Sequence, residues 1–586
     1  MINNAMANLT FPDAKTAVIE LLTAALKVVA PAAVDTVITL ERPKQAQHGD
    51  FSCNVAMQLA KALREKPRDI AQKLLANLPA SPLVAKAEIA GAGFINVFVT
   101  QASKQIVINQ ILTSGPRFGE CGLGAQRKVQ VEFVSANPTG PLHVGHGRGA
   151  AYGACLANVL AATGHEVTRE FYINDAGRQM DILAASVWLR YLEARGTVVA
   201  FPADGYRGDY VRDIARALDA AHAEQFQHAF PTTAPAEGED ADAALDALIA
   251  RAKLTLGEHW RVLHQFALDA MLADQRDDLA QFGVTYDRWF SEQSLHDGGA
   301  ASAVARAMEA LQRNGHLYEK DGARWFRSTT FGDEKDRVVC RENGQYTYFA
   351  SDIAYHLNKI DRGYDQLIDV WGADHHGYIA RVKGALTAMG VDADKLTVTL
   401  VQFAVLFRGT EKVAMGKRAG EFVSLRELRD EVGNDATRFF YVLRKSDQHL
   451  DFDMELAKSR TNENPVYYIQ YAHARVCSVY AQCNADAASL TGTDPSPLSA
   501  ESELELLQKL AEYPEIVANA ARELSPHLIA FYLKDLAALF HSYYNGTRFL
   551  VDETGTRNAR LALAGAVRQV IVNGLALLGV SAPEKM

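Results

Sequence analysis

Cysteine is scarce and scattered in this chain. Its six cysteines, among 586 residues, form no Cys-x-x-Cys pair, which is the spacing typical of zinc knuckles. No disulfide framework is expected, and the thiols are predicted to be reduced and structural. The sequence therefore predicts no metal site and no structural zinc.

Long apolar runs and an excess of positive charge are also missing. No run reaches the length that a bilayer requires, and the first eight residues lack the basic and apolar regions of a secretion signal. The formal net charge of −10 does not by itself indicate a nucleic-acid binder, although a local basic groove remains compatible with it. We expect a cytoplasmic protein with no membrane contact.

The chain is too long for a single hydrophobic core, so several domains are expected. Helical periodicity over 12–29, over 54–63 and from Pro67 onward, followed by strand-like alternation over 91–99, predicts an N-terminal α+β domain of residues 1–115. Apolar stripes at helical spacing predict an all-α helix bundle over 455–586.

The middle of the chain, residues 116–454, alternates strand and helix patterns. This alternation predicts an α/β domain with a Rossmann-like, doubly wound parallel sheet. The strand candidates in this domain are residues 129–133, 167–172, 366–370 and 396–401. A mostly helical insertion is expected at about 185–285, with an acidic loop at 231–242.

One junction in this region combines a strand, a glycine-rich turn and a helix. The strand pattern at 129–134 is followed by Ser-Ala-Asn-Pro-Thr-Gly-Pro-Leu-His-Val-Gly-His-Gly-Arg-Gly at 135–149, and helix-like sequence follows at 150–162. Such a turn directs backbone N–H groups and the positive end of the helix dipole toward an anion. His143 and His146 share one face of the first helical turn, where they could donate to phosphate oxygens.

The stretch Pro-Leu-His-Val-Gly-His at 141–146 resembles the HIGH signature of class I aminoacyl-tRNA synthetases. Glu-Lys-Val-Ala-Met-Gly-Lys-Arg-Ala-Gly at 411–420 resembles their mobile KMSKS loop, with Ala414 and Gly416 replacing a lysine and the serine. The resemblance implies that His143 and His146 stabilise the α-phosphate, and that Lys417 and Arg418 stabilise the leaving pyrophosphate. The implied ATP-binding residues are Gly140, His143, Gly145, His146, Gly147, Asp374, His375, His376, Met415 and Lys417.

Further blocks resemble arginyl-tRNA synthetases, in the same order and over essentially the whole chain. They are residues 131–138, 169–179, 331–338, 346–356, 526–537 and 577–586. The resemblance implies activation of L-arginine by ATP, with Mg²⁺ arriving on the ATP, and transfer of arginine to the terminal adenosine of tRNA(Arg). It also implies that activation requires bound tRNA and that the protein is a monomer.

Arginine carries a planar cation that carboxylates recognise well. By resemblance, the arginine-binding residues are Glu132, Asn137, Tyr348, Asp352 and His376, with Asp352 assigned to the guanidinium. An alternative interpretation is that Ser351 and Asp352 merely cap a helix. Asp374, His375 and His376 could also pass for metal ligands, but adjacent histidines diverge and no third partner is evident, so a substrate contact is favoured.

Domain resemblance implies that residues 1–115 bind the tRNA elbow and that residues 455–586 bind the anticodon. The implied tRNA-binding residues are Phe94, Asn96, Tyr467, Tyr471, Tyr544 and Met586. Phe94 offers a face for base stacking, but it could equally be a core residue.

Two other functions remain open at this point. Another class I enzyme, such as a cysteinyl-tRNA synthetase, would need soft zinc ligands, which the scattered cysteines do not supply. A non-catalytic tRNA-binding paralogue is motivated by the substituted lysine loop.

Overall fold

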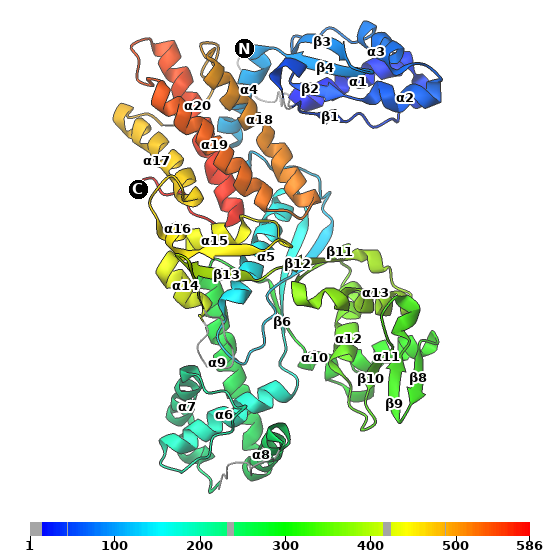
Figure 1. Cartoon of the computed structure of the whole chain (residues 1–586), viewed down its shortest axis with the longest axis vertical. Coiled ribbons are helices and arrows are strands. Elements are labelled where there is room, and N and C mark those ends of the chain that lie inside the picture. Colours follow the sequence, from blue (N-terminus) through cyan, green and yellow to red (C-terminus); the bar gives the residue numbers. More distant parts are fainter. Residues whose placement is uncertain (1–13, 44, 231–239, 414–422, 487) are drawn as a thin grey trace, which may run out of the picture.

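The computed structural model describes residues 14–43, 45–230, 240–413, 423–486 and 488–586. The N-terminal domain lies at the top right of Figure 1, the C-terminal helices lie at the top left, and the α/β domain lies below them. Two insertions extend from the α/β domain, one downward around α6 to α9 and one to the right around α10 to α12.

The N-terminal domain packs three helices against a four-stranded antiparallel sheet of order β1-β2-β4-β3. Its elements are α1 (Ala14–Val29), β1 (Leu40–Glu41), β2 (Phe51–Cys53), α2 (Val55–Leu63), α3 (Pro67–Ala76), β3 (Val84–Ala90) and β4 (Phe94–Val99). The predicted helices are confirmed where described. The strand predicted over 91–99 begins only at Phe94, because Gly91 and Gly93 have positive φ and form the β3–β4 turn. Strand β3 was missed because its burial does not alternate.

A five-stranded parallel sheet of order β12-β11-β5-β6-β7 forms the centre of the α/β domain. The strands are β5 (Lys128–Glu132), β6 (Glu166–Ile173), β7 (Arg288–Ser291), β11 (Gln366–Gly372) and β12 (Leu396–Val401). The chain starts in the middle at β5, builds outward through β6 and β7, and returns to the other side of β5 through β11 and β12. The predicted doubly wound sheet is confirmed, and its topological switch lies between β5 and β11.

Helix α5 (Val144–Ala162) begins six residues before the predicted helix. The glycines between 145 and 149 hid its start, because glycine is a poor helix former. A Cβ on Gly147 would lie 2.7 Å from the Tyr441 ring, and a Cβ on Gly153 would lie 2.3 Å from Phe133. Close packing against neighbouring rings explains both glycines.

The first insertion is helical, as predicted, and consists of α6 (Arg178–Ala194), α7 (Asp209–His222), α8 (Ala241–Leu256) and α9 (His259–Gln281). Most of its predicted acidic loop, at 231–239, lies outside the described residues. The second insertion was not predicted. It contains α10 (Gln293–His296), α11 (Ala303–Arg313), the antiparallel strands β8 (Leu317–Lys320), β9 (Ala323–Phe326) and β10 (Arg337–Cys340), and α12 (Tyr348–Asp361).

Helix α13 (Ile379–Ala388) follows β11, and a small three-stranded sheet follows β12. That sheet and the helices beside it are β13 (Ala404–Arg408), β14 (Glu411–Lys412), α14 (Leu425–Val432), α15 (Asn434–Val442), β15 (Leu450–Asp453) and α16 (Met454–Lys458). Arg148 of α5 is buried and donates to the carbonyls of Gln402, Lys445 and Gln448 at 2.8–2.9 Å. These bonds fix the small sheet to the start of α5.

The C-terminal bundle contains α17 (Pro465–Cys483), α18 (Glu501–Arg522), α19 (His527–Gly546) and α20 (Thr554–Leu578), and α4 (Gln101–Ser114) packs against α18 and α20. Of the described helices, α20 alone is long and apolar enough to cross a membrane by length and composition, which the sequence analysis did not expect. However, 72 % of its most apolar window is buried, so we interpret α20 as the core helix of the bundle. Hydrogen bonds from Tyr152 to Leu524 O (2.6 Å) and from Asn158 to Leu577 O (3.1 Å) join α5 to the bundle.

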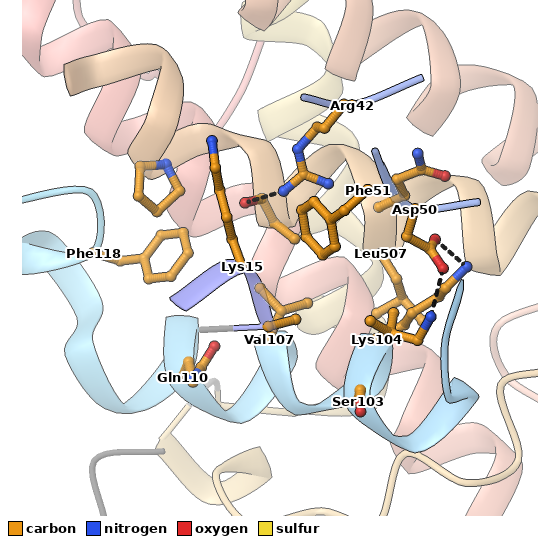
Figure 2. A pocket seen from close by; sticks show the side chains of 15 residues that line it. Lys15, Arg42, Asp50, Phe51, Ser103, Lys104, Val107, Gln110, Phe118 and Leu507 are labelled. Carbon is orange, nitrogen blue, oxygen red and sulfur yellow. Dashed lines mark hydrogen bonds and ion pairs between the residues drawn. The ribbon is translucent and has the colours of Figure 1, made fainter. Parts of the chain in front are cut away.

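The N-terminal domain has a hydrophobic core of its own, separate from the core that α5 shares with the bundle. It meets the bundle at α18, where Lys15 and Arg42 both pair with Glu515. A small cavity beside these charges has apolar walls that include Phe51, Val107, Phe118 and Leu507 (Figure 2). The contact between the two domains is thus a shared carboxylate next to a loosely filled apolar junction.

Candidate active site

The predicted site lies where β5 ends beside β11. Glu132, the last residue of β5, is paired in register with Asp369 of β11. Ligands of open α/β sheets bind outside the carboxyl ends of the strands at such a switch point. The glycine-rich turn follows β5, a 3₁₀ helix follows β11, and Lys359 joins α12 (Figure 1) to the paired residues of both strands.

His143 and His146 form the entrance of α5. His143 is the N-cap, and its Nδ1 accepts the Gly145 N–H at 3.0 Å, while Nδ1 of His146 accepts the His143 N–H at 3.2 Å. The two rings stack with their centroids 3.7 Å apart. Because each Nδ1 is an acceptor, the neutral rings carry their protons on Nε2 and can donate from that atom. The backbone thus selects the tautomer that a phosphate oxygen needs.

Gly145 and Gly147, which are predicted to bind ATP, also pack against side chains of the protein itself. A Cβ on Gly145 would lie 2.8 Å from the His143 ring and 3.3 Å from Phe403, and a Cβ on Gly147 would strike Tyr441. Both glycines are therefore required by contacts within the protein, whatever ligand lies above them. The carbonyls of Gly140 and Asn137 accept from Gln275 of α9 at 2.9 and 3.0 Å, so the first insertion fixes the turn.

Helix α12 carries Tyr348 and Asp352 one turn apart. Thr347 is the N-cap residue, so the alternative in which Ser351 and Asp352 cap this helix is wrong. Tyr348 is 52 % exposed, and the Asp352 carboxylate accepts a hydrogen bond from the Tyr378 hydroxyl. Burial raises the pKa of Asp352 to about 6; the Tyr378 bond opposes this, and the nearby charges of Glu292 and Glu132 add to it.

Two residues beside Asp352 were missed by the sequence analysis. Glu292 is buried directly after β7, and Tyr172 of β6 interacts with its carboxylate. Burial, together with the charges of Glu292, Asp352 and Glu132, raises the pKa of Tyr172 far above its ordinary value. The site therefore gathers three acidic groups around the Tyr172 hydroxyl. Glu292 could have been found from its place after a strand, but β7 is only four residues long.

A buried set of charges behind the site was also missed. Lys359 of α12 donates to Asp369 Oδ1 at 2.7 Å and to Glu132 Oε2, and His356 Nε2 bonds the other oxygen of Asp369 at 2.8 Å. Beside them, Glu170 accepts from Tyr355 at 2.7 Å and from Arg362 at 2.8 Å. Charged residues inside otherwise apolar strands, such as Glu170 and Asp369, were the available sign of this network.

Asn137 lies at the front of the site within a set of carboxamides. Its Nδ2 donates to Gln179 at 2.8 Å, and its Oδ1 accepts from Asn174 at 3.2 Å. Asp175, from the same sequence block, accepts from the Ser291 hydroxyl at 2.6 Å and from the Gln293 N–H at 2.9 Å. These bonds explain the Asn-Asp-Ala-Gly-Arg-Gln pattern, because they join the end of β6 to the turn and to β7.

The segment after β11 is an exposed 3₁₀ helix, η7 (Ala373–Tyr378), that bears Asp374, His375 and His376. Across the described part of the chain, no three His, Cys, Asp or Glu side chains are grouped as metal ligands.

Met415, Lys417 and Arg418 lie outside the described residues. The chain after them joins the turn, since Val144 N donates to Val423 O at 3.2 Å and Leu425 N donates to Leu142 O at 2.8 Å.

The residues predicted to contact tRNA occupy two separate surfaces. Phe94 is 37 % exposed, whereas Asn96 is only 3 % exposed and its Oδ1 accepts from Ser52 at 2.8 Å. On the bundle, Tyr467 stacks on Tyr471 with ring centroids 5.9 Å apart. Arg475 lies over Tyr471 and Tyr544, and Met586 lines a groove together with Tyr467.

Comparison with known families assigns each part of the chain. Residues 16–99 match the arginyl tRNA synthetase N terminal domain, residues 107–449 match the tRNA synthetases class I (R) catalytic domain, and residues 469–586 match the DALR anticodon binding domain. An arginine–tRNA ligase of Nitrosospira multiformis is 62 % identical and covers 98 % of this chain and 99 % of its own length. One of Dechloromonas aromatica is 60 % identical over 98 % of this chain and its full length.

Solved structures agree with these sequence matches. A crystal structure of an arginyl t-RNA synthetase from Campylobacter jejuni has a TM-score of 0.74 and 34 % identity, and covers 83 % of this chain and 100 % of its own. The Thermus thermophilus arginyl-tRNA synthetase has a TM-score of 0.73 over 98 % of this chain and 100 % of its own, at 24 % identity, and supports the fold.

Proposed function

The chain belongs to the arginyl-tRNA synthetase family of class I, and on that premise we propose which of its residues carry out each part of the reaction. The enzyme is an arginine–tRNA ligase: it uses ATP to convert L-arginine to arginyl-adenylate and pyrophosphate, and transfers the arginyl group to tRNA. Such a reaction needs positioning and charge neutralisation rather than a protein nucleophile.

The guanidinium of arginine is assigned to Asp352, with Glu292 as a second acceptor nearby. Both belong to the acidic group that faces Tyr172, and the observation that carries the assignment is this concentration of buried negative charge beside Tyr348. Fixed carboxylates suit a planar cation with five donors. Tyr348 lines the same cavity as Glu292, and Asn137 is assigned to the polar groups of the substrate. Glu132, whose oxygens are held by Ser135 and Lys359, and the exposed His376 remain candidate contacts.

The phosphates of ATP are assigned to the start of α5. Nε2 of His143 and of His146 donates to the α-phosphate as negative charge builds there during displacement by the arginine carboxylate. The N-terminus of α5 adds its dipole. Gly140, Gly145 and Gly147 form the floor, and Asp374, His375 and His376 the opposite side. Lys417 and Arg418, with Met415, are assigned to the pyrophosphate end, because the chain flanking them is joined to the turn.

Mg²⁺ would arrive with ATP and be held mainly by the phosphates; no protein ligand is assigned to it.

The N-terminal domain, residues 1–115, presents Phe94 to the tRNA elbow, and Asn96 is left out because its side chain is buried. The bundle, residues 455–586, presents Tyr467, Tyr471, Tyr544 and Met586 to the anticodon. The α/β domain between them spans 116–454. We further propose a cytoplasmic monomer.

The function is tested by ATP–pyrophosphate exchange with each of the amino acids, with and without tRNA(Arg). Exchange that depends on arginine and appears only when tRNA is added is the expected result. Tight tRNA binding with no exchange would favour the non-catalytic alternative. Exchange with a different amino acid would overturn the assignment of the pocket.

The affinity for arginine should depend on pH through Asp352. Because burial raises the pKa of this carboxyl to about 6, its protonated fraction grows as the pH falls through that value, and a neutral acid cannot pair with the guanidinium. The KM for arginine should be constant above about pH 7 and rise about tenfold per pH unit well below 6. Initial rates of exchange from pH 5 to 8 measure it, with the KM for ATP as the internal reference. An arginine KM that is flat down to pH 5 would contradict the assignment.

A further inference from the structure

The backbone between β5 and the histidine turn has an unusual shape. Val134 has φ 70° and Ser135 has φ 43°, so two consecutive residues other than glycine are left-handed. This region is unfavourable for L-residues, and for a β-branched residue such as valine it is a genuine outlier. Such strain persists only where the surrounding structure imposes it. The two residues lie just before Asn137 and the turn that holds both histidines.

Hydrogen bonds from both neighbouring strands hold this left-handed turn. The Ser135 hydroxyl donates to Glu132 Oε1 at 2.8 Å and accepts the Tyr172 N–H of β6 at 3.1 Å. The Ser135 N–H donates to Phe133 O at 3.0 Å. Glu132 is therefore the anchor on the β5 side. Its position depends on whatever holds its other oxygen.

That other oxygen is held by Lys359, which is completely buried. The ammonium lies between Glu132 and Asp369, and Asp369 is bound in turn by His356. Burial lowers the pKa of Lys359, but the two carboxylates outweigh burial and raise it, so the side chain is charged. Lys359 lies behind Glu132, on the helix that also carries Asp352 two turns earlier.

We propose that Lys359 is a positioning residue that acts through Glu132 to hold the left-handed turn at Val134–Ser135. It thereby places Asn137, His143 and His146 for the reaction. Since α12 also carries Asp352, one helix sets both the guanidinium contact and the turn that leads to the phosphate contacts. The inference rests on the proposed function only for the identity of the groups that are placed; the support of the turn by Lys359 is independent of it.

A double-mutant cycle tests the proposal. Lys359→Met should lower the kcat of arginine-dependent exchange about 10²-fold, the effect expected for displaced reacting groups, with a smaller change in the arginine KM. Val134→Gly alone should leave kcat within about threefold, because glycine adopts positive φ without strain. In the Lys359→Met background, Val134→Gly should restore kcat about tenfold, since a glycine turn keeps its shape with less support.

Ala125→Gly is the matched control. Ala125 also has positive φ, at 47°, but it lies in an exposed loop before β5. The Ala125→Gly substitution should remove a similar backbone penalty without restoring the kcat of the Lys359→Met enzyme. If Val134→Gly and Ala125→Gly both restore the kcat of Lys359→Met, any gain in stability suffices. If the effects of Lys359→Met and Val134→Gly on kcat simply multiply in the double variant, Lys359 serves only to neutralise the buried carboxylates. Either result overturns the proposal.

A second variant covers the case in which Lys359→Met does not fold. Ser135→Ala cuts the turn from Glu132 while leaving the Glu132–Lys359 pair intact, and should lower kcat about tenfold with rescue by Val134→Gly. Melting temperatures of the same proteins report the coupling without reference to activity. If the wild-type enzyme shows no arginine-dependent exchange, the proposed function fails. Melting temperatures that are non-additive between the Val134 and Lys359 or Ser135 substitutions would still support the role of Lys359 in holding the turn. Changes in melting temperature that simply add would overturn the proposed role of Lys359 without affecting the proposed function.

Discussion

Asp352→Asn should raise the KM for arginine at least about 30-fold. Asparagine keeps the shape of the side chain and can still bond the Tyr378 hydroxyl, but it removes the charge that faces the guanidinium. Truncating one partner of a buried, hydrogen-bonded charge pair costs about 2–5 kcal/mol, which corresponds to roughly 30-fold to several thousand-fold in affinity. Arginine titrations in the tRNA-dependent exchange assay measure the effect, and the KM for ATP should change little.

Asp361→Asn provides the control for this substitution. Asp361 ends the same helix and is exposed, so the same chemical change should leave the arginine KM within about twofold, as is usual for exposed surface substitutions. An Asp352→Asn enzyme that binds arginine normally would show that the guanidinium lies elsewhere. Equal losses in both variants would point to general damage to α12.

His146→Asn should lower kcat for adenylate formation about 10²- to 10³-fold, the range found when one donor to a developing oxyanion is removed. The asparagine carboxamide can replace Nδ1 as acceptor of the His143 N–H, so the start of α5 should survive. What is lost is the Nε2 donor, which matters more in the transition state than in the ground state. Single-turnover formation of arginyl-adenylate in the presence of tRNA measures the step directly.

His449→Asn is the companion variant for that experiment. His449 is exposed and pairs only with Asp451 among its described neighbours, and its replacement should not change the rate. A His146→Asn enzyme with normal kcat and a raised KM for ATP would contradict the assigned role, because it would place the histidine in ground-state binding alone.

The parts of the fold that were predicted have strong local patterns. Helix α19, with Tyr532, Leu536 and Phe540 buried at helical spacing, and the apolar strand β12 could be identified without tertiary information. The second insertion could not, since β8, β9 and β10 are four residues each and only partly buried. Short, half-exposed strands lack the alternation on which such predictions depend. The early start of α5 was hidden because Gly147 is required by its packing against Tyr441, and Gly145 by its packing against Phe403, both far away in the sequence.

Part of the candidate site could also be predicted from local sequence, and part could not. His143, His146, Tyr348 and Asp352 stand in motifs that point to chemistry, and the structure brings them to one edge of the sheet. The supporting charges were invisible because their partners are distant in sequence: Lys359 meets Glu132 across 227 residues, and Arg362 meets Glu170 across 192. The left-handed turn was equally hidden, because nothing in Val134 or Ser135 suggests positive φ.

A crystal structure with a non-hydrolysable arginyl-adenylate analogue, in which a sulfamoyl group replaces the phosphate, tests the central assignment most directly. We expect the guanidinium to donate to Asp352, and the sulfamoyl oxygens to lie within hydrogen-bonding distance of His143 and His146. A guanidinium paired instead with the exposed Asp374, with Asp352 still bonded to Tyr378 alone, would contradict it.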